Sequence, residues 1–104
     1  MRIVLSADHR GAAVIRQLHE KLRREGQDAE IIGDCSGGPV DYPDRAYQVG
    51  QLVGSGKADL GILVCGTGIG MSIAANKVAG VRAAVCHDEL TAQLSRSHNN
   101  ANVL

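Results

Sequence analysis

The sequence has no phenylalanine or tryptophan, and Tyr42 and Tyr47 are its only tyrosines, although 44% of its 104 residues are hydrophobic. The core must therefore consist of Val, Ile, Leu and Ala. This mixture suits α/β packing, because β-branched residues fill a central sheet while Ala and Leu face it from helices. A chain of this length is expected to form one domain with an ordinary core.

An excess of charge is also missing, and so is any long apolar run. Eleven basic and eleven acidic residues cancel, and like charges do not cluster, which argues against nucleic acid or an anionic membrane as a partner. No apolar stretch approaches the length of a membrane span, and no secretory signal precedes the first strand-like segment. The three cysteines form no C-x-x-C pair, which argues against a disulfide framework or a zinc site and predicts a cytoplasmic protein.

What the sequence does contain is a regular alternation of strand and helix patterns. Strands are predicted at residues 3–7, 29–32, 60–64 and 81–86, with a fifth strand beginning at 102–104. Helical patterns cover about 11–25, 41–55 and 87–97, and a further one runs from a glycine loop to about 78. A loop is expected at 33–43. The alternation predicts a three-layer, Rossmann-like α/β fold with a mostly parallel sheet of about five strands, in which ligands bind beyond the carboxyl ends of the strands.

The glycine loop is the most informative segment. An apolar run ends at Cys65, three alternating glycines (Gly66, Gly68 and Gly70) follow, and a helical pattern begins with Ser72 near its start. A buried strand, a glycine turn and a helix N-terminus together present several backbone N–H groups to one point, which favours an anion. A thiolate at such a helix start is stabilised by the helix dipole and by N–H groups, so Cys65 is a candidate nucleophile or general base.

Other interpretations of this loop remain open. The glycines can serve only a tight turn and close packing, and Cys65 can be a buried structural cysteine. Two of the glycines match the first half of a dinucleotide fingerprint, but Met71 stands at the position of its third glycine. No Gly-Lys-Ser/Thr follows, which excludes a Walker A loop.

Three further polar positions have a functional and a structural interpretation. Asp8 and His9 follow the first predicted strand and are placed to bind a substrate hydroxyl or phosphate, although Asp8 can equally cap the next helix. His98 follows a predicted helix, where it can act as a general acid near neutral pH or simply favour the helix dipole. His19 lies among charged residues of the first helical pattern and is expected in solvent.

Five motifs in the same order resemble those of the ribose-5-phosphate isomerase B family, which includes the galactose-6-phosphate isomerase subunits. The resemblance runs from Arg2 to Leu104, and the third and fourth motifs are highly specific. The motifs are D-H-x-G at 8–11, D-Y-P at 41–43, C-G-T-G-I-G at 65–70, S-I-A-A-N-K at 72–77 and S-R-x-H-N at 95–99.

The resemblance implies an enzyme that interconverts an aldose phosphate and a ketose phosphate through an enediolate, without metal or organic cofactor. Ribose 5-phosphate is the expected substrate, and the alternatives are galactose 6-phosphate, allose 6-phosphate or a tetrose phosphate. By similarity, Cys65 would be the base and His98 the acid that opens the sugar ring. The Thr67 hydroxyl and the backbone amides of residues 66–70 would stabilise the enediolate, which brings Ile69 into the site.

The resemblance also implies substrate contacts and partners. Asp8 and Asn99 would hold sugar hydroxyls, His9 would lie towards the phosphate, and Tyr42 would line the pocket. Family members are dimers or pairs of dimers with sites at the subunit boundary, so the segment with His98 and Asn99 is expected to come from the partner chain.

One departure from the family concerns its phosphate-binding arginines, which lie beyond the residue that matches Leu104. We expect residues 1–104 to form a single sugar-phosphate isomerase domain without that C-terminal segment. Arg82 and Arg96 match family positions outside the phosphate clamp. A truncated, non-catalytic subunit that binds sugar phosphate therefore stays open as an alternative.

Overall fold

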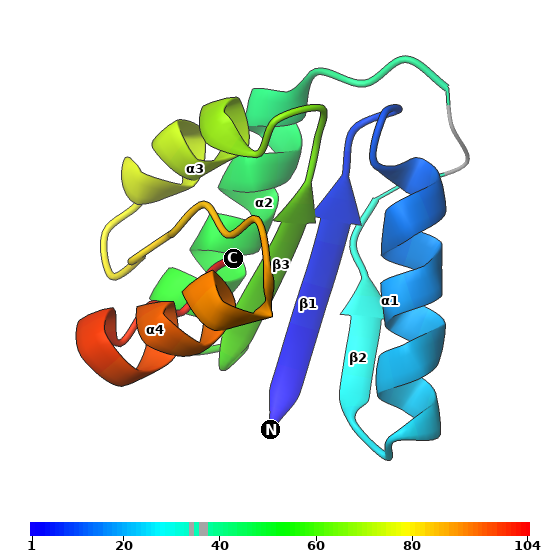
Figure 1. The fold of residues 1–104 in the computed structure, drawn as a ribbon. Coiled ribbons are helices and arrows are strands. Elements are labelled where there is room, and N and C mark those ends of the chain that lie inside the picture. Colours follow the sequence, from blue (N-terminus) through cyan, green and yellow to red (C-terminus); the bar gives the residue numbers. More distant parts are fainter. Residues whose placement is uncertain (34, 36–37) are drawn as a thin grey trace.

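A computed structural model describes residues 1–33, 35 and 38–104 of the chain (Figure 1). Part of the predicted loop at 33–43 thus falls on positions 34, 36 and 37, outside the described residues. Strands and helices alternate through the first two thirds of the chain, as predicted. The elements are β1 (Arg2–Ala7), α1 (Ala12–Arg24), β2 (Asp28–Ile31), α2 (Tyr42–Gly54), β3 (Leu60–Val64), α3 (Ile69–Asn76) and α4 (Glu89–Asn99).

The sheet is parallel and has the strand order β2-β1-β3. Parallel strands need a crossover connection, which α1 supplies between β1 and β2 and α2 supplies between β2 and β3. Because crossovers are right-handed and the second one returns past β1, the two helices lie on opposite faces of the sheet. The predicted Rossmann-like architecture is confirmed.

Two apolar clusters hold the layers together, one on each face of the sheet. Successive residues of β1 alternate between them: Ile3, Leu5 and Ala7 pack with Ile15 of α1, while Val4 packs on the face of α2 and α3. Fully burying one such aliphatic side chain stabilises the fold by about 1.5–3 kcal/mol. The aliphatic core expected from the missing aromatic residues is therefore present, with Met71 of α3 added to it.

The fourth and fifth predicted strands are reduced to isolated bridges, in which Val103 pairs in parallel with Gly61 of β3 and with Ala83. The prediction of about five strands is therefore wrong in number, since the described sheet has three. The pairing is confined to residues 102–104, so each pair of segments forms no more than a single bridge. Beside it, the Arg82 N–H donates to Oδ1 of Asn102 at 2.7 Å, and the Ala83 N–H donates to Oδ1 of Asn76 at 2.8 Å. These two N–H groups thus bond side-chain amides and not a further strand.

Helix ends differ from the predictions by a few residues. α3 ends at Asn76 instead of about 78, where the Asn76 side chain bonds the backbone of Ala83 in both directions. α4 starts at Glu89 and continues to Asn99, so His98 lies in its last turn and not after it. His19 is half-buried, with Nε2 3.0 Å from the Ala29 carbonyl oxygen, and is not the solvated residue expected from its charged neighbours.

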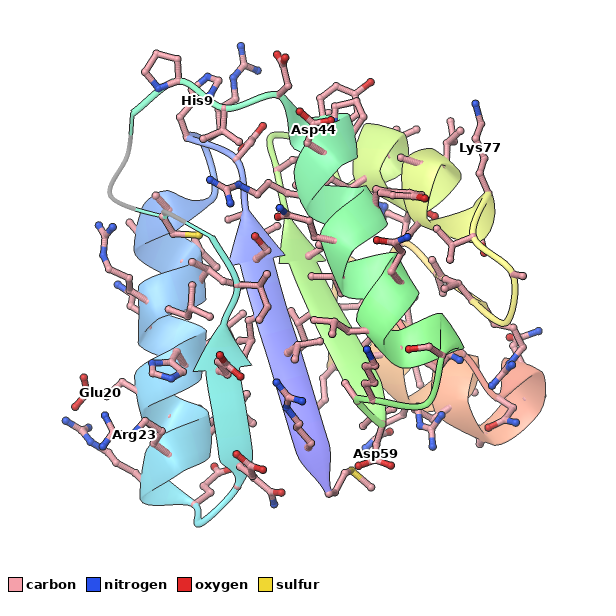
Figure 2. All side chains as sticks on the ribbon, turned by 180° about the vertical axis from the view of Figure 1, so that it is seen from behind. His9, Glu20, Arg23, Asp44, Asp59 and Lys77 are labelled. Carbon is pink, nitrogen blue, oxygen red and sulfur yellow. The ribbon has the colours of Figure 1, made fainter. Side chains whose placement is uncertain are left out.

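α4 stands apart from the other elements. It lies on the side of the sheet away from α2 (Figures 1 and 2), and within the described residues its backbone does not approach any other helix or strand closely. Ser95 is its one buried residue. In the described parts of the chain, no helix has the length and apolar character needed to cross a membrane.

Candidate active site

A cleft of about 610 Å³ opens beyond the carboxyl ends of β1 and β3, at the place predicted for a ligand. Three chain segments meet there: the β1–α1 turn, the start of α2 and the glycine loop after β3. Figure 2 shows His9 and Asp44 at this end of the sheet and Arg23 and Asp59 at the opposite end. The lining consists of residues 8–10, 40–44, 65–67 and Gly70. Its volume falls within the roughly 300–1,000 Å³ usual for small-molecule sites.

Cys65 is the half-buried residue directly after β3, and its thiol lies inside the turn that leads into α3. The backbone N–H of Gly68 donates to Sγ of Cys65 at 3.0 Å. Gly68 is the N-cap of α3 and has φ 80°, a left-handed conformation that glycine adopts without strain. The alternation of glycines therefore lets the chain fold around the sulfur, and the N–H group and the N-terminus of α3 both stabilise negative charge on it.

Of the other backbone N–H groups of the glycine loop, one is hydrogen-bonded and three are open, that is, without an acceptor in the described residues. The Ile69 N–H donates to Oγ1 of Thr67 at 3.2 Å, at the start of α3. The N–H groups of Gly66, Thr67 and Gly70 find no acceptor within the described residues, and all three residues line the cleft. An anion bound beside Cys65 thus has unpaired donors available.

Asp8 is held firmly at the end of β1. It is 7% exposed, and its Oδ1 accepts the N–H groups of Arg10 at 2.9 Å and Gly11 at 3.1 Å. The N-cap of α1 is Gly11, so Asp8 stabilises the turn before the helix and is not the helix cap itself. Its second oxygen, Oδ2, bonds no described residue and is available to a ligand in the cleft.

Tyr42 and His9 complete the part of the predicted site that one chain assembles. Tyr42 opens α2, and its ring lies over the glycine loop: a Cβ atom placed on Gly70 would be 2.6 Å from Cε1 of Tyr42. A residue with a side chain therefore cannot replace Gly70 unless Tyr42 moves. His9 is exposed at the rim of the cleft.

Four predicted site residues do not line this cleft. Gly68 and Ile69 are not part of the cleft lining, and the Ile69 side chain is 54% exposed. His98 and Asn99 lie in the last turn of α4 and are exposed. The described chain therefore brings the thiol and the glycine loop together with Asp8, His9 and Tyr42, but does not bring His98 and Asn99 to them.

Arg10, Asp41 and Asp44 also line the cleft and were not among the predicted site residues. The signal for Arg10 was its place next to Asp8 and His9 at a strand end, where any polar residue can face a ligand. The signal for the two aspartates was weaker, since acidic residues at a helix start are common for reasons of capping alone.

All three cysteines are free, and among the described residues no group of His, Cys, Asp and Glu side chains is arranged to hold a metal ion.

Outside the cleft, one carboxylate has a shifted pKa. The hydrogen bonds from the backbone N–H and then the side-chain hydroxyl of Thr91 lower the pKa of Asp88 below its ordinary value of 3.8. Both bonds belong to the capping box that starts α4.

Comparison with known proteins points to one family. The family described as Ribose/Galactose Isomerase matches residues 3–104. Ribose-5-phosphate isomerase B of Escherichia coli is 46% identical over 103 residues, which cover 99% of this chain and 69% of that protein. D-erythrulose-4-phosphate isomerase of Pectobacterium atrosepticum is 41% identical over 105 residues, which cover 100% of this chain and 69% of that protein.

A solved structure extends the likeness to three dimensions. Ribose-5-phosphate isomerase B of Clostridium thermocellum has a TM-score of 0.96 to this chain at 45% identity, covering all of this chain and 70% of that one. This chain thus spans roughly 70% of the length of its relatives. The match over nearly every residue confirms the resemblance that the sequence motifs indicated. The chain belongs to the ribose/galactose isomerase family, and it is a sugar-phosphate isomerase.

Proposed function

We propose that this sugar-phosphate isomerase interconverts ribose 5-phosphate and ribulose 5-phosphate through an enediolate, with Cys65 as the base. One observation carries the proposal: Sγ of Cys65 accepts the Gly68 N–H at 3.0 Å in a loop whose open amides line the same cleft. A proton carrier and oxyanion donors thus share one short segment. The substrate is inferred from relatives named as ribose-5-phosphate isomerase B.

The chemistry requires one proton to move between neighbouring carbons. The Cys65 thiolate removes the proton from C2 of the open-chain aldose, the electron pair forms the C1–C2 double bond, and the oxygen on C1 takes up the negative charge. The proton then returns from Sγ to C1, while the hydroxyl proton on O2 passes to O1 and a carbonyl forms at C2. Every atom of the aldose is retained in the ketose, so no co-reactant is consumed.

The enediolate oxygens would accept the open N–H groups of Gly66, Thr67 and Gly70, with the Thr67 hydroxyl as a further donor. Such donors are fixed in place before the reaction, so they stabilise the developing charge without reorganising. Losing one typically costs about 2.7–4 kcal/mol of transition-state stabilisation. The glycine loop would therefore matter as much as the base.

The remaining contacts divide between two chains. Asp8 would hold sugar hydroxyls through its free Oδ2, Tyr42 would line the pocket, and His9 would lie towards the phosphate. His98 would open the sugar ring as an acid, and Asn99 would hold a hydroxyl. Because these last two are exposed at the end of α4 and absent from the cleft, we propose that a homodimer or a pair of dimers places them in the partner's site.

The decisive experiment replaces the base. We expect Cys65→Ala to lower kcat for ribose 5-phosphate by about 10²–10⁴-fold, the usual contribution of general acid–base catalysis. The matched control is Cys86→Ala, which removes another half-buried thiol that does not line the cleft. It should keep normal turnover. Near-normal turnover by Cys65→Ala, with both variants folded by circular dichroism, would contradict the proposed base.

A tetrose phosphate is the second candidate substrate, because one relative is named D-erythrulose-4-phosphate isomerase. Ketose formation from tetrose, pentose and hexose phosphates, compared by kcat/KM, decides between these substrates. Turnover of none of them, together with calorimetric binding of ribose 5-phosphate, would instead support a non-catalytic sugar-phosphate-binding subunit.

A further inference from the structure

We propose that Arg10 is a further substrate-contacting residue of this site, whose guanidinium stabilises the enediolate at the glycine loop. The inference deepens the proposed function and rests on it. It starts from the one side chain with a permanent positive charge among the described residues that line the cleft.

The Arg10 side chain lies against the glycine loop. A Cβ atom placed on Gly66 would lie 3.1 Å from both Cδ and Nη1 of Arg10. The arginine side chain thus reaches from the end of β1 across to the loop after β3 and lies against the residue that follows Cys65. Its Nη1 thus lies beside Gly66, a residue whose N–H is open and at which the negative charge of an enediolate would gather.

The Arg10 side chain starts from a rigid turn. The Arg10 N–H donates to Oδ1 of buried Asp8 at 2.9 Å, and the Gly11 N–H donates to the Asp8 carbonyl oxygen at 3.2 Å. Gly11 is also packed so tightly against the Val64 carbonyl oxygen that a side chain there would collide with it. The backbone of Arg10 is therefore fixed relative to the end of β3, which limits the entropy lost when the guanidinium binds an anion.

The positive charge of Arg10 has no partner among the described residues. Asp8, Asp41 and Asp44 all line the cleft, yet the Arg10 guanidinium forms no hydrogen bond or ion pair with any described residue. Three carboxylates would repel an anionic sugar phosphate, and the guanidinium of Arg10 compensates part of this repulsion. Its free N–H donors can form charge-assisted hydrogen bonds to an oxyanion.

The place of Arg10 favours the enediolate over the phosphate as its anion. In the proposed reaction, C1 and C2 lie beside Cys65, and the phosphate on C5 is at the far end of the same molecule. A guanidinium against Gly66 is at the reacting end. Arg10 should therefore act mainly on the transition state, where the charge develops, and little on ground-state binding.

Kinetics of Arg10→Gln test this role. We expect kcat for ribose 5-phosphate to fall roughly tenfold, less than for a buried oxyanion donor because Arg10 is exposed and solvent screens its charge. The KM and the inhibition constant of inorganic phosphate should stay within about twofold. Arg10→Lys should recover part of the kcat. Arg23→Gln, which removes an equal charge at the far end of α1 (Figure 2), should change none of these values.

Two kinetic outcomes would overturn the inference. An unchanged kcat in Arg10→Gln would mean that the guanidinium does not act in the reaction. A weaker inhibition by inorganic phosphate together with a raised KM and a normal kcat would assign Arg10 to the phosphate.

A second measurement does not depend on turnover. Anionic iodoacetate and neutral iodoacetamide alkylate the same thiol, and the ratio of their rates at Cys65, followed by peptide mass spectrometry, reports positive charge beside Sγ. We expect this ratio to fall several-fold in Arg10→Gln and to be unchanged in Arg23→Gln. An equal ratio in Arg10→Gln and the parent chain would contradict the inference. Absence of turnover in the parent chain would reject the proposed function, and the alkylation ratio would still decide whether Arg10 acts on an anion at Cys65.

Discussion

The glycine loop at residues 65–70 and the last turn of α4 carry the two proposed proton-transfer groups, and these two regions differ in burial and in packing. Cys65 is half-buried, bonded by Gly68 and surrounded by three segments of the chain. His98 is exposed on a helix whose backbone approaches no other helix or strand in the described residues. In the proposed mechanism, one chain thus surrounds its base, whereas its acid is exposed. This difference supports the proposal that a second copy supplies the acid.

The largest expected effect concerns His98 in the last turn of α4. We expect His98→Gln to lower kcat for ribose 5-phosphate by about 10²–10⁴-fold, since the ring would have to open without its acid. Turnover of ribulose 5-phosphate, which has no furanose ring to open, should fall much less. Initial rates measured from both substrates check this. An equal loss in the two directions would contradict a role in ring opening.

Mixing variants tests whether the acid comes from the partner. Cys65→Ala and His98→Gln chains, each nearly inactive, are denatured together and refolded. If sites are shared, mixed dimers contain one intact site, and about a quarter of the parental activity should return. Recovery of no activity, with mixed dimers demonstrated by native mass spectrometry, would place both groups in one chain.

The next effect concerns the glycine loop around Cys65. Gly68→Ala forces a side chain onto φ 80° in the loop that holds Cys65, and Gly26→Ala does so at φ 81° in open space after α1. Both should lower the free energy of unfolding by about 1–2 kcal/mol, the cost of a left-handed residue with a side chain. Gly68→Ala alone should also lower kcat, by about 10²-fold, because it displaces the amide donors. Steady-state kinetics and urea unfolding separate the two effects, and equal activity of both variants would mean that the loop serves only as a turn.

A smaller effect concerns the hydrogen bonds that join α3 to the segment before α4. Asn76 of α3 donates to the Ala83 carbonyl oxygen at 2.9 Å and accepts the Ala83 N–H at 2.8 Å, which fixes the segment that leads to α4. Asn76→Ala should lower the free energy of unfolding in urea by about 1–3 kcal/mol, given a net 0.5–1.5 kcal/mol for each bond. The matched control is Gln93→Ala, which removes an exposed amide from α4 itself. Equal stability of the two variants would show that the link contributes nothing.

The smallest effect concerns the start of α4. Because the pKa of Asp88 is lowered in the folded chain, its charge stabilises the fold above the unfolded pKa of about 3.8, and this contribution is lost as the pH falls through the folded pKa. Asp88→Asn keeps a capping oxygen without the charge. Urea unfolding should show a small deficit for Asp88→Asn at about pH 7 that disappears near pH 2. A deficit independent of pH would exclude the charge as its cause.

Much of the glycine loop and of the cleft could be predicted from sequence because their conformation depends on local residues. An apolar run that ends in Cys65, followed by alternating glycines, leaves few conformations other than a strand, a turn around the thiol and a helix start. The order of strands and the cleft at their carboxyl ends follow from the right-handed crossover rule. The contact between Sγ and the Gly68 N–H is visible only in the three-dimensional structure, but the pattern had indicated its kind.

The segment between α3 and α4 was less predictable because its structure depends on residues far from it in the sequence. Residues 81–86 have the composition of a buried strand, but their pairing is limited to one bridge with Val103, and Asn76 and Asn102 bond the N–H groups of Ala83 and Arg82. Nothing within that segment records this. Arg10 was likewise overlooked, since only the three-dimensional structure reveals that Gly66 lies beneath its guanidinium.

The hydrogen bond between the Gly68 N–H and Sγ of Cys65 has a consequence for the timing of the reaction. The amide bonds the sulfur most strongly while the sulfur is negative. In the proposed reaction, the sulfur is neutral once the thiolate has taken the proton from the sugar, and the negative charge has moved to an oxygen beside the same loop. The Gly68 N–H acts on the sulfur, and the neighbouring open N–H groups of Gly66, Thr67 and Gly70 line the cleft in which that oxygen would lie. One short loop would in this way stabilise both ends of the proposed proton transfer, with different amides for the sulfur and for the oxygen.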